Sequence, residues 1–284
     1  RKGCHVMGKE ILSNNMNYAF QVEYQYCALK QQCVDNRELL RIVNNENNKN
    51  IIKAWGYEHV EALKCIDPIN CSPMCFKTQY PGMVIGMGYP HQTGKATGEI
   101  QVGFSFDYVT GAPYYPGSSL KGIIRSVFDQ AVGNDLYLEY ITDVLNEVSD
   151  RGTVTQENVK ADIGDCINDV FGHAHNADVT DGTGDIFYGA FVIASDKDII
   201  GMDSITPHGT DPTKNPVPIT MLRIMPDVTI AVMINVRENK KLEDTIFDCK
   251  TRKKLYQHII EDFGMGAKRN VGYGSVVETV YTTK

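Results

Sequence analysis

The stretch GAPYYPGSSLKGIIRS, from Gly111 to Ser126, predicts a loop that runs into a helix. Pro116 comes shortly before two residues that favour helix N-caps, Ser118 and Ser119. The apolar residues that follow recur at helical spacing, namely Leu120, Ile123, Ile124, Val127 and Phe128. We therefore expect a helix that begins at one of the two serines and runs past residue 130.

The same stretch has the chemistry of an anion site. The first turn of a helix offers backbone N–H groups without intrahelical partners and the positive end of the helix dipole. Lys121 and Arg125 follow, one turn apart. An ordinary serine-capped helix explains these residues equally well. The Gly-x4-Gly-Lys-Ser/Thr spacing of a Walker A phosphate loop does not occur in this stretch.

A second candidate site lies near the C-terminus, where residues 264–274 read GMGAKRNVGYG. Glycines such as Gly266 let the backbone come within hydrogen-bonding distance of a ligand. Lys268 and Arg269 supply positive charge, and Tyr273 supplies an aromatic face on which a base can stack. A glycine-rich turn between a helix and a strand is also common for structural reasons alone, so this motif does not decide its own role.

The hydrophobic pattern predicts the other elements. Residues 13–65 contain no proline and predict two or three helices, separated by a loop at the asparagine-rich stretch 44–48. Apolar residues alternate over 99–109, which indicates a half-buried strand. The pair Pro226-Asp227 predicts a hairpin turn between two strands. The remaining expected elements are strands at 83–87, 186–194, 217–225, 228–236 and 274–281 and helices at 137–148, 157–171 and 243–263.

This order of elements is typical of an α+β protein with an antiparallel sheet and helices packed on one of its faces. A ferredoxin-like, or split βαβ, core is the simplest arrangement that fits. We expect two parts, an N-terminal helical extension over residues 1–80 and a sheet-containing domain over residues 81–284.

A long proline-rich loop over residues 203–219 contains a third candidate, His208. Structureless connections of this length are uncommon in compact domains unless they are functional. His208 has the chemistry of a general acid or base, but no carboxylate or second histidine at an informative spacing supports that role. A histidine at the protein surface is the simpler interpretation.

The cysteines raise the question of a metal site. Cys65, Cys71 and Cys75, with His59 upstream, suggest structural zinc, but their spacing lacks a clean Cys-x2-Cys pair. No cofactor is otherwise expected. The cysteines within helical patterns are expected to be small buried hydrophobes, namely Cys27, Cys33, Cys166 and Cys249.

The acidity of the chain is concentrated in one segment. The 284 residues carry 28 Lys and Arg against 35 Asp and Glu, a net charge of −7, which for the chain as a whole argues against a phosphate-bearing partner. Residues 129–185 hold thirteen acidic and two basic side chains, so the other 227 residues have a net charge of +4. We expect the acidic segment to face away from a nucleic acid or toward a basic neighbouring protein.

Composition favours a soluble protein of the cytoplasm. The hydrophobic fraction of 42% is ample for a packed core, and eight cysteines are too few for a disulfide scaffold of this length. The longest apolar runs, such as residues 230–234, fall far short of the roughly 18 residues that a membrane-spanning helix needs. The first residue is Arg1 rather than methionine, so this position is not interpreted as a native start.

The motifs, taken in order, resemble the RAMP superfamily of CRISPR-associated RNA-binding proteins. The resemblance rests on PGSSLKG at 116–122 with the arginine that follows, and on the glycine-rich loop at 264–274. Thr206-Pro207-His208 together with NPVPI at 215–219 resembles more narrowly the family of sixth subunits of type III-B (Cmr) effector complexes. The resemblance covers about residues 81–281.

This resemblance implies an RRM-like ferredoxin core and a thumb-like hairpin insertion at about 91–98, which wedges between bases of the guide–target duplex. It implies a non-catalytic subunit that binds the 3′ part of the CRISPR RNA (crRNA), with target RNA and the other subunits of the complex as further partners. The residues that it assigns to RNA are Ser118, Ser119, Lys121, Arg125, His208, Gly266, Lys268, Arg269, Tyr273, His91 and Lys95.

Two other RAMP activities remain as alternatives. One is an endoribonuclease that processes CRISPR repeats, with His208 or His91 as the base. The other is a backbone subunit that cuts target RNA with a loop aspartate, such as Asp107, and a divalent metal. The Thr-Pro-His and Asn-Pro-Val-Pro motifs favour the sixth-subunit interpretation over the second alternative.

Overall fold

The computed structural model describes residues 36–65, 71–86, 100, 104–107, 112–150, 152–172, 184–206 and 218–280. The expected thumb-like hairpin with His91 and Lys95, and the part of the proline-rich loop that contains His208, lie outside the described residues.

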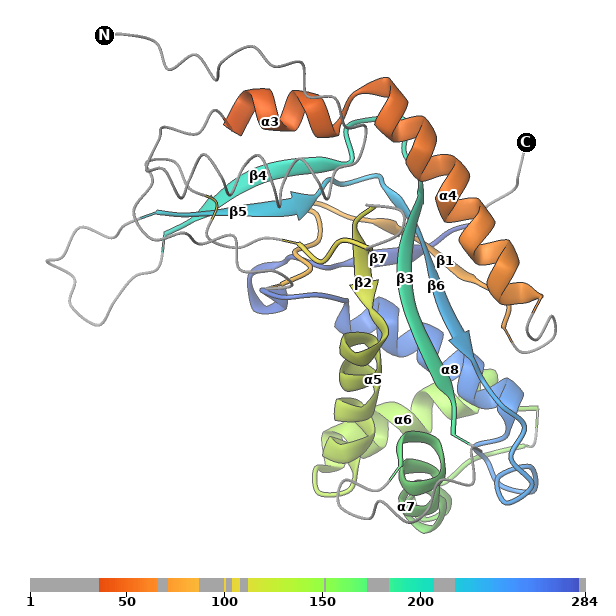
Figure 1. Ribbon diagram of the computed structural model, residues 1–284. Coiled ribbons are helices and arrows are strands. Elements are labelled where there is room, and N and C mark those ends of the chain that lie inside the picture. The colour runs from red at the N-terminus through yellow and green to blue at the C-terminus, as the bar shows by residue number, and fades with distance from the viewer. Residues whose placement is uncertain are drawn as a thin grey trace, which may run out of the picture.

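The centre of the structure is a five-stranded antiparallel sheet in the order β2-β3-β6-β1-β7 (Figure 1). Its strands are β1 (Met74–Thr78), β2 (Tyr114–Pro116), β3 (Ile186–Ala194), β6 (Thr229–Asn235) and β7 (Val276–Glu278). Helix α5 (Gly117–Ala131) precedes β3, and α8 (Cys249–Phe263) connects β6 to β7. Without the short edge strand β2, the chain order is βαββαβ, as in ferredoxin-like folds. The expected α+β core with an antiparallel sheet is confirmed.

Strand β1 lies between β6 and β7 in this sheet, although its residues belong to the part expected to be a helical extension. Its side chains alternate, with Met74, Phe76 and Thr78 buried and the residues between them half-buried. The sequence did not predict this strand, because prolines lie on both sides of it and the cysteines in and before it suggested a loop. The sheet domain therefore begins before residue 81, and the helical extension ends before β1.

Helices cover both faces of the sheet rather than one. Ile230 and Val232 of β6 belong to the main core, which α5 and α8 complete, and helices α6 (Asp135–Val148) and α7 (Gln156–Phe171) pack against these two helices. Met233 of β6 points to the other face, where it shares a cluster with Val60 of α4 (Glu46–Lys64). The expectation of helices on a single face is therefore wrong, because the N-terminal helix α4 packs across the second face (Figure 1).

A separate two-stranded sheet projects from this core. It consists of β4 (Ile200–Ile205) and β5 (Ile219–Ile224), which pair along their whole length. The expected hairpin between β5 and β6 is therefore wrong. The turn at Pro226-Asp227 does form, and Asp227 adopts a φ of 66° in it. Asp227 donates its N–H to the carbonyl of Thr78 at 2.8 Å, so the turn is hydrogen-bonded to the end of β1.

Two helices begin elsewhere than expected. Helix α8 begins at Cys249 rather than at residue 243. Its N-cap is Asp248, whose carboxylate accepts a hydrogen bond from the N–H of Thr251 at 2.9 Å. Helix α3 (Asn36–Val43) ends before Asn44, and α4 begins at Glu46 inside the asparagine-rich stretch that was expected to be a loop. None of the helices in the described part of the chain is long and apolar enough to cross a membrane.

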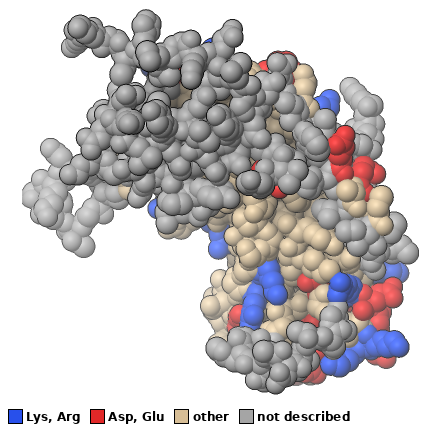
Figure 2. All heavy atoms as spheres, in the orientation of Figure 1, with Lys and Arg blue, Asp and Glu red and all other residues tan. Residues whose placement is uncertain are grey.

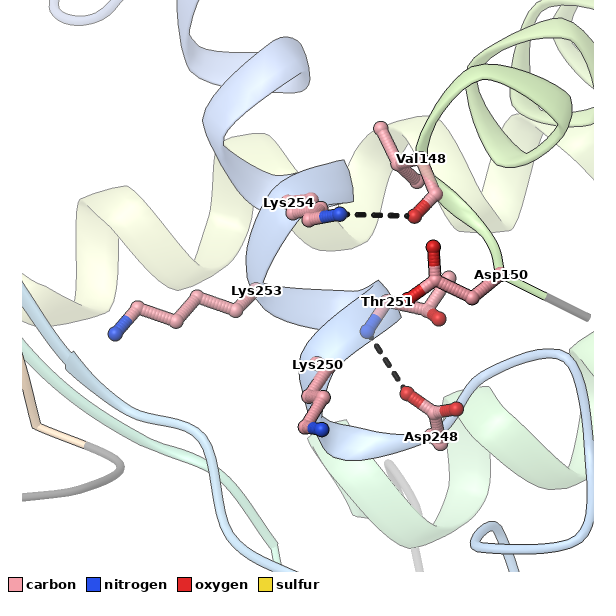
Figure 3. A pocket seen from close by; sticks show the side chains of 7 residues that line it. All are labelled: Val148, Asp150, Asp248, Lys250, Thr251, Lys253 and Lys254. Carbon is pink, nitrogen blue, oxygen red and sulfur yellow. Dashed lines mark hydrogen bonds between the residues drawn. The ribbon is translucent and has the colours of Figure 1, made fainter.

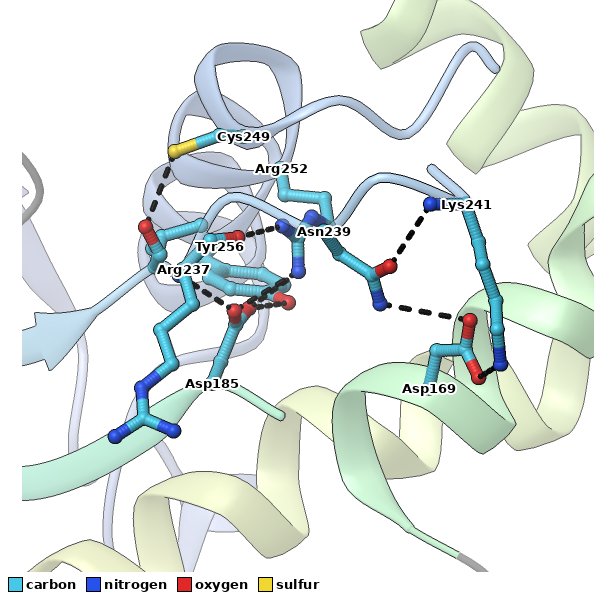
Figure 4. A network of polar contacts seen from close by, with 9 residues as sticks. Asp169, Asp185, Arg237, Asn239, Lys241, Cys249, Arg252 and Tyr256 are labelled. Carbon is cyan, nitrogen blue, oxygen red and sulfur yellow. Dashed lines mark hydrogen bonds and ion pairs between the residues drawn. The ribbon is translucent and has the colours of Figure 1, made fainter. Parts of the chain in front are cut away.

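A buried ion pair joins the sheet to α8 (Figure 4). Arg252 is fully buried and donates from Nη1 to both carboxylate oxygens of Asp185, at 2.9 Å each, and from Nη2 to the carbonyl of Arg237. The hydroxyl of Tyr256 donates to the same carboxylate at 2.8 Å. Asp185 immediately precedes β3 and Arg237 follows β6, so these contacts fix the ends of two central strands against the helix.

Replacing Arg252 with methionine tests this junction. Arg252→Met leaves the carboxylate of Asp185 buried without its counter-charge, so we expect the free energy of unfolding to fall by about 3–5 kcal/mol. The matched control is Lys241→Met, which removes an exposed ion pair to Asp169 at 3.4 Å and is expected to change stability by less than about 1 kcal/mol. Denaturant titrations measure both, and similar values for the two variants would contradict the interpretation.

Two glycines of α5 provide a second test. Gly117 packs so closely on β3 that a Cβ atom there would overlap the carbonyl oxygen of Phe187, whereas a Cβ atom at Gly122 would meet nothing within 4 Å. We expect Gly117→Ala to lower the free energy of unfolding by about 1–3 kcal/mol. Gly122→Ala is expected to raise it by up to about 1 kcal/mol through helix propensity. Urea denaturation of both variants checks this, and equal stabilities would rule out the close approach.

Candidate nucleic-acid interface

The first turn of α5 is exposed, as expected of an anion site, but no serine caps it. The N-cap residue is Pro116, and no side chain forms a cap hydrogen bond at this end of the helix. Pro116 also pairs with Gly189 of β3, so the chain stays extended until the helix begins at Gly117. The predicted serine cap is therefore wrong. Ser118 and Ser119 lie within the first turn, both exposed, next to N–H groups that have no side-chain acceptor at the N-cap.

The two cations behind this turn differ in how they are paired. The Nε of Arg125 lies 3.2 Å from the carboxylate of Asp129, four residues on, which offsets its charge. Lys121 is half-buried and forms no ion pair among the described residues. The available positive charge at this helix therefore comes from Lys121 and the helix dipole, with a smaller contribution from Arg125.

The glycine-rich loop at 264–274 has a fixed shape, because main-chain hydrogen bonds close it and attach it to the segment after β1. The N–H of Met265 donates to the carbonyl of Gly274 at 2.8 Å, and the N–H of Gly274 donates to the carbonyl of Gly82 at 2.8 Å. The N–H of Ala267 donates to the carbonyl of Val84 at 2.7 Å. Gly274 has a φ of 84°, and a Cβ atom there would overlap the carbonyl oxygen of Met265. Glycine is needed here for the close approach as well as for the backbone angle.

The two basic residues of this loop are both exposed, but they differ in their contacts. Lys268 adopts a left-handed conformation, with a φ of 62°, just before the short 3-10 helix η2 (Arg269–Val271). Arg269 donates from Nη1 to the carbonyl of Phe263 at 3.1 Å, which places its charge at the C-terminal end of α8. Lys268 forms no ion pair among the described residues, so it is the more available cation of the two.

Tyr115 connects the two candidate loops. It lies in β2, two residues before α5, and its side chain is buried. Burial raises the pKa of its hydroxyl, while the nearby backbone of Gly266 and the nearby charge of Arg269 act in the opposite direction. The start of α5 and the glycine-rich loop therefore lie on one side of the molecule, a proximity that the sequence motifs alone did not reveal.

Tyr273 does not present the stacking face that was expected of it. Its side chain is only 8% exposed and packs with Val84 and Met221. Its hydroxyl donates to Asp203 of β4 at 2.7 Å, and burial, followed by this bond, raises its pKa to about 12. Tyr273 therefore remains a neutral donor that attaches the glycine-rich loop to β4. The expectation of a stacking role is wrong because the local motif does not indicate which side of the loop is packed.

An exposed aromatic side chain lies beside the same loop, at Tyr80. It is 84% exposed, and Pro81, which follows it, lies next to Gly272 of the loop. Val271 of η2 is also exposed. Tyr80 was not among the residues predicted to form the site. The available signal was an aromatic residue immediately before Pro81 and Gly82, a combination that is typical of a turn.

The cysteines give no metal site within the described residues. Cys71 and Cys75 belong to the apolar cluster on the α4 side of the sheet, and Cys65 is exposed at the end of α4. No group of three or more His, Cys, Asp or Glu that could hold a metal ion occurs in the part of the chain that the structure describes. The side chain of His59 lies outside the described residues.

Four cysteines were expected to be buried. Cys27 and Cys33 lie outside the described residues, and the other two differ in burial. Cys166 is fully buried, and burial raises the pKa of its thiol. Cys249 is only half-buried and donates to the carbonyl of Val236 at 3.1 Å.

A pocket of about 410 Å³ lies between the end of α6 and the start of α8 (Figure 3). Its carboxylates, Asp150 and Asp248, oppose the binding of an anion. Lys254 donates to the carbonyl of Val148 at 3.1 Å, and Lys253 points away from the carboxylates (Figure 3). This pocket therefore lacks the converging cations of a phosphate site.

The acidic segment forms the helical layer farthest from the sheet. Helix α6 exposes carboxylates at four-residue intervals, and acidic and basic side chains are interspersed over the lower part of the face in Figure 2. The exposed acidic residues of α6 are Asp135, Glu139, Asp143 and Glu147. Their like charges repel a phosphate backbone, so any RNA surface is expected to lie away from this layer.

Comparison with known proteins finds similar sequences and similar structures. The chain is 26% identical over 268 residues to the CRISPR system Cmr subunit Cmr6 of Pyrococcus furiosus, covering 81% of this chain and 74% of that protein. It resembles a chain in the cryo-EM structure of the type III-B Cmr-beta complex bound to cognate target RNA, with a TM-score of 0.56 and 19% identity over 86% of this chain and 71% of that chain.

The crystal structure of Cmr6 from Pyrococcus furiosus aligns with a TM-score of 0.44 and 23% identity, covering 74% of this chain and 98% of that chain. The family model of the RAMP superfamily matches residues 75–277, which begin within β1 and end within β7. Because this match spans the whole ferredoxin-like core and both candidate loops, the chain belongs to the RAMP superfamily.

Proposed function

We propose that this chain is a non-catalytic, RNA-binding subunit of a type III-B CRISPR effector complex, and that it holds the 3′ part of the crRNA and helps to shape the guide–target duplex. The similarity to Cmr6 and to a chain of a Cmr complex bound to target RNA supports this proposal. Its partners are then crRNA, target RNA and the other subunits of the complex.

The observation that carries the proposal is the proximity of the two loops. Tyr115 precedes the exposed first turn of α5, and its side chain lies near the backbone of Gly266 in the glycine-rich loop. One side of the molecule thus carries exposed hydroxyls at Ser118 and Ser119 together with the exposed cation Lys268. This set of groups suits phosphates of an RNA backbone.

The chemistry of this surface is suited to a guide of any sequence. Helix N-termini and glycine-rich backbones bind phosphate oxygens and carry no information about the bases. In RNA-guided complexes, base pairing between guide and target supplies the sequence specificity. A subunit that holds the guide through its backbone therefore accepts every spacer.

The charge distribution limits how strongly the isolated chain binds. Arg125 is paired with Asp129, and Arg269 lies at the C-terminal end of α8, so among these four cations the half-buried Lys121 and the exposed Lys268 have the least offset charges. The acidic helices α6 and α7 oppose a longer RNA path over this chain. Neighbouring subunits are expected to complete the path.

Salt dependence tests the assignment of the two lysines. If Lys121 and Lys268 each contact one phosphate, the double variant Lys121→Ala/Lys268→Ala lowers the slope of log K against log salt by about 1.4, or about 0.7 per phosphate of a single strand. Fluorescence anisotropy with labelled single-stranded RNA of mixed sequence measures this slope. An unchanged slope would contradict the assignment.

The matched control removes two lysines that lie beside carboxylates of the acidic helices α6 and α7. Lys160 lies 3.9 Å from Asp135, and Lys241 lies 3.4 Å from Asp169, so both charges are already offset locally. The double variant Lys160→Ala/Lys241→Ala is expected to leave the salt slope unchanged. A decrease in the salt slope as large as that of the first variant would indicate that RNA binds at the helical layer and would overturn the proposal.

An absence of nuclease activity is the second expectation. Purified chain incubated with labelled CRISPR repeat RNA, with and without Mg²⁺, is expected to leave the RNA intact on a denaturing gel. Cleavage that disappears in His208→Ala or His91→Ala would instead favour the repeat-processing endoribonuclease. Mg²⁺-dependent cleavage of target RNA that disappears in Asp107→Ala would favour the target-cutting subunit.

A further inference from the structure

The exposed ring of Tyr80 projects from a turn whose backbone is fixed. Its side chain is 84% exposed, yet the turn that carries it is closed by a hydrogen bond from the N–H of Gly82 to the carbonyl of Gln79 at 2.7 Å. The N–H of Gln79 donates to the carbonyl of Ser275 at 2.9 Å, which ties the turn to the end of the glycine-rich loop. The ring therefore projects into solvent from a rigid backbone.

A second set of contacts holds the same turn from the other side. The carbonyl of Pro81 accepts a hydrogen bond from Nη1 of Arg223 in β5. The same guanidinium lies 3.1 Å from Asp203 in β4, and Asp203 also accepts the hydroxyl of Tyr273. The turn, the β4–β5 sheet and the glycine-rich loop are thus joined through one carboxylate. A preorganised turn loses little backbone freedom when a ligand binds.

The surroundings of Tyr80 indicate the kind of ligand. The Cδ atom of Pro81 lies 3.8 Å from the position of a Cβ atom on Gly272, so the turn that carries Tyr80 lies beside the glycine-rich loop. The exposed cations Lys268 and Arg269 belong to the same loop. Proteins bind single-stranded nucleic acid with this combination of an aromatic ring for a base and positive charge for the adjacent backbone.

We propose that Tyr80, and not the buried Tyr273, is the residue on which an RNA base stacks when the glycine-rich loop holds the neighbouring phosphate. This inference rests on the proposed RNA-binding function and adds to it a named contact with a base. Because every base has a π face, the contact tolerates any guide sequence.

Three substitutions of the full chain separate stacking from other roles of the side chain. Tyr80→Ala is expected to weaken binding of a labelled single-stranded RNA of mixed sequence by about tenfold. Tyr80→Phe, which keeps the ring, should stay within about twofold of the original affinity, and Tyr80→Trp should bind at least as tightly. Since the ring is exposed, thermal unfolding is expected to be unchanged in all three variants.

Salt dependence supplies a readout that a merely structural role would not reproduce. Tyr80→Ala should lower affinity without changing the slope of log K against log salt, because a stacked base releases no counterions. Lys268→Ala should lower the slope by about 0.7. The control is Leu136→Ala, which removes an exposed apolar side chain on the acidic helix α6 and should leave affinity and slope unchanged.

Each other outcome overturns the inference. If the chain binds RNA and Tyr80→Ala binds equally well, the stacking contact is wrong while the proposed function stands. An equal loss of affinity in Tyr80→Phe would assign the effect to the hydroxyl. If the complex isolated with Tyr80→Ala lacks a protein subunit while RNA affinity is unchanged, Tyr80 is a protein contact. If neither the chain nor its complex binds RNA, the proposed function fails together with this inference.

Discussion

The main-chain hydrogen bonds between the glycine-rich loop and residues 82–84 are the constraint on which the rest of the candidate surface depends. They attach the segment after α8 to the segment after β1, two parts of the chain that are far apart in sequence. Gly274 permits the close approach, since a side chain there would overlap the carbonyl of Met265. With the loop fixed in this way, Gly266 reaches Tyr115, and the start of α5 joins the same side of the molecule.

The ferredoxin-like core keeps this arrangement in place. The ion pair of Arg252 and Asp185 holds the ends of two central strands against α8, the helix that leads into the glycine-rich loop. Helix α4 closes the second face of the sheet near β3. Part of that face is thereby occupied by protein, so the exposed loops at the start of α5 and after α8 are the better candidates for contact with RNA.

Local patterns predicted much of the secondary structure. The strand at 186–194 and the three helices after residue 116 agree closely with their predicted ranges, because each has an uninterrupted hydrophobic period. The pairing of strands was harder to predict. Pro226-Asp227 does form a turn, but the partner of β5 is β4, and a turn signal does not identify the partner of a strand. β1 was not predicted because it has only five residues, one of them a cysteine, and prolines lie on both sides of it.

For the candidate site, the motifs pointed to two loops that lie on one side of the molecule, but they did not indicate how each side chain in these loops is placed. Lys268 and the two serines are exposed as expected, whereas Arg125 is paired with Asp129. Tyr273 is buried while Tyr80 is exposed, a distinction that depends on packing against β4 and β5 and therefore on contacts distant in sequence. Sequence patterns indicate which residue types gather in a loop, but exposure is set by the tertiary structure.

The most direct test of the central claim is to map the RNA on the chain within its native complex. A tag on the full chain allows the complex to be isolated, and ultraviolet crosslinking followed by mass spectrometry identifies the peptides joined to RNA. The account predicts co-purification of a guide-length RNA and crosslinks within residues 112–125 and 264–274. Crosslinks confined to the acidic helices α6 and α7, or a complex without RNA, would contradict it.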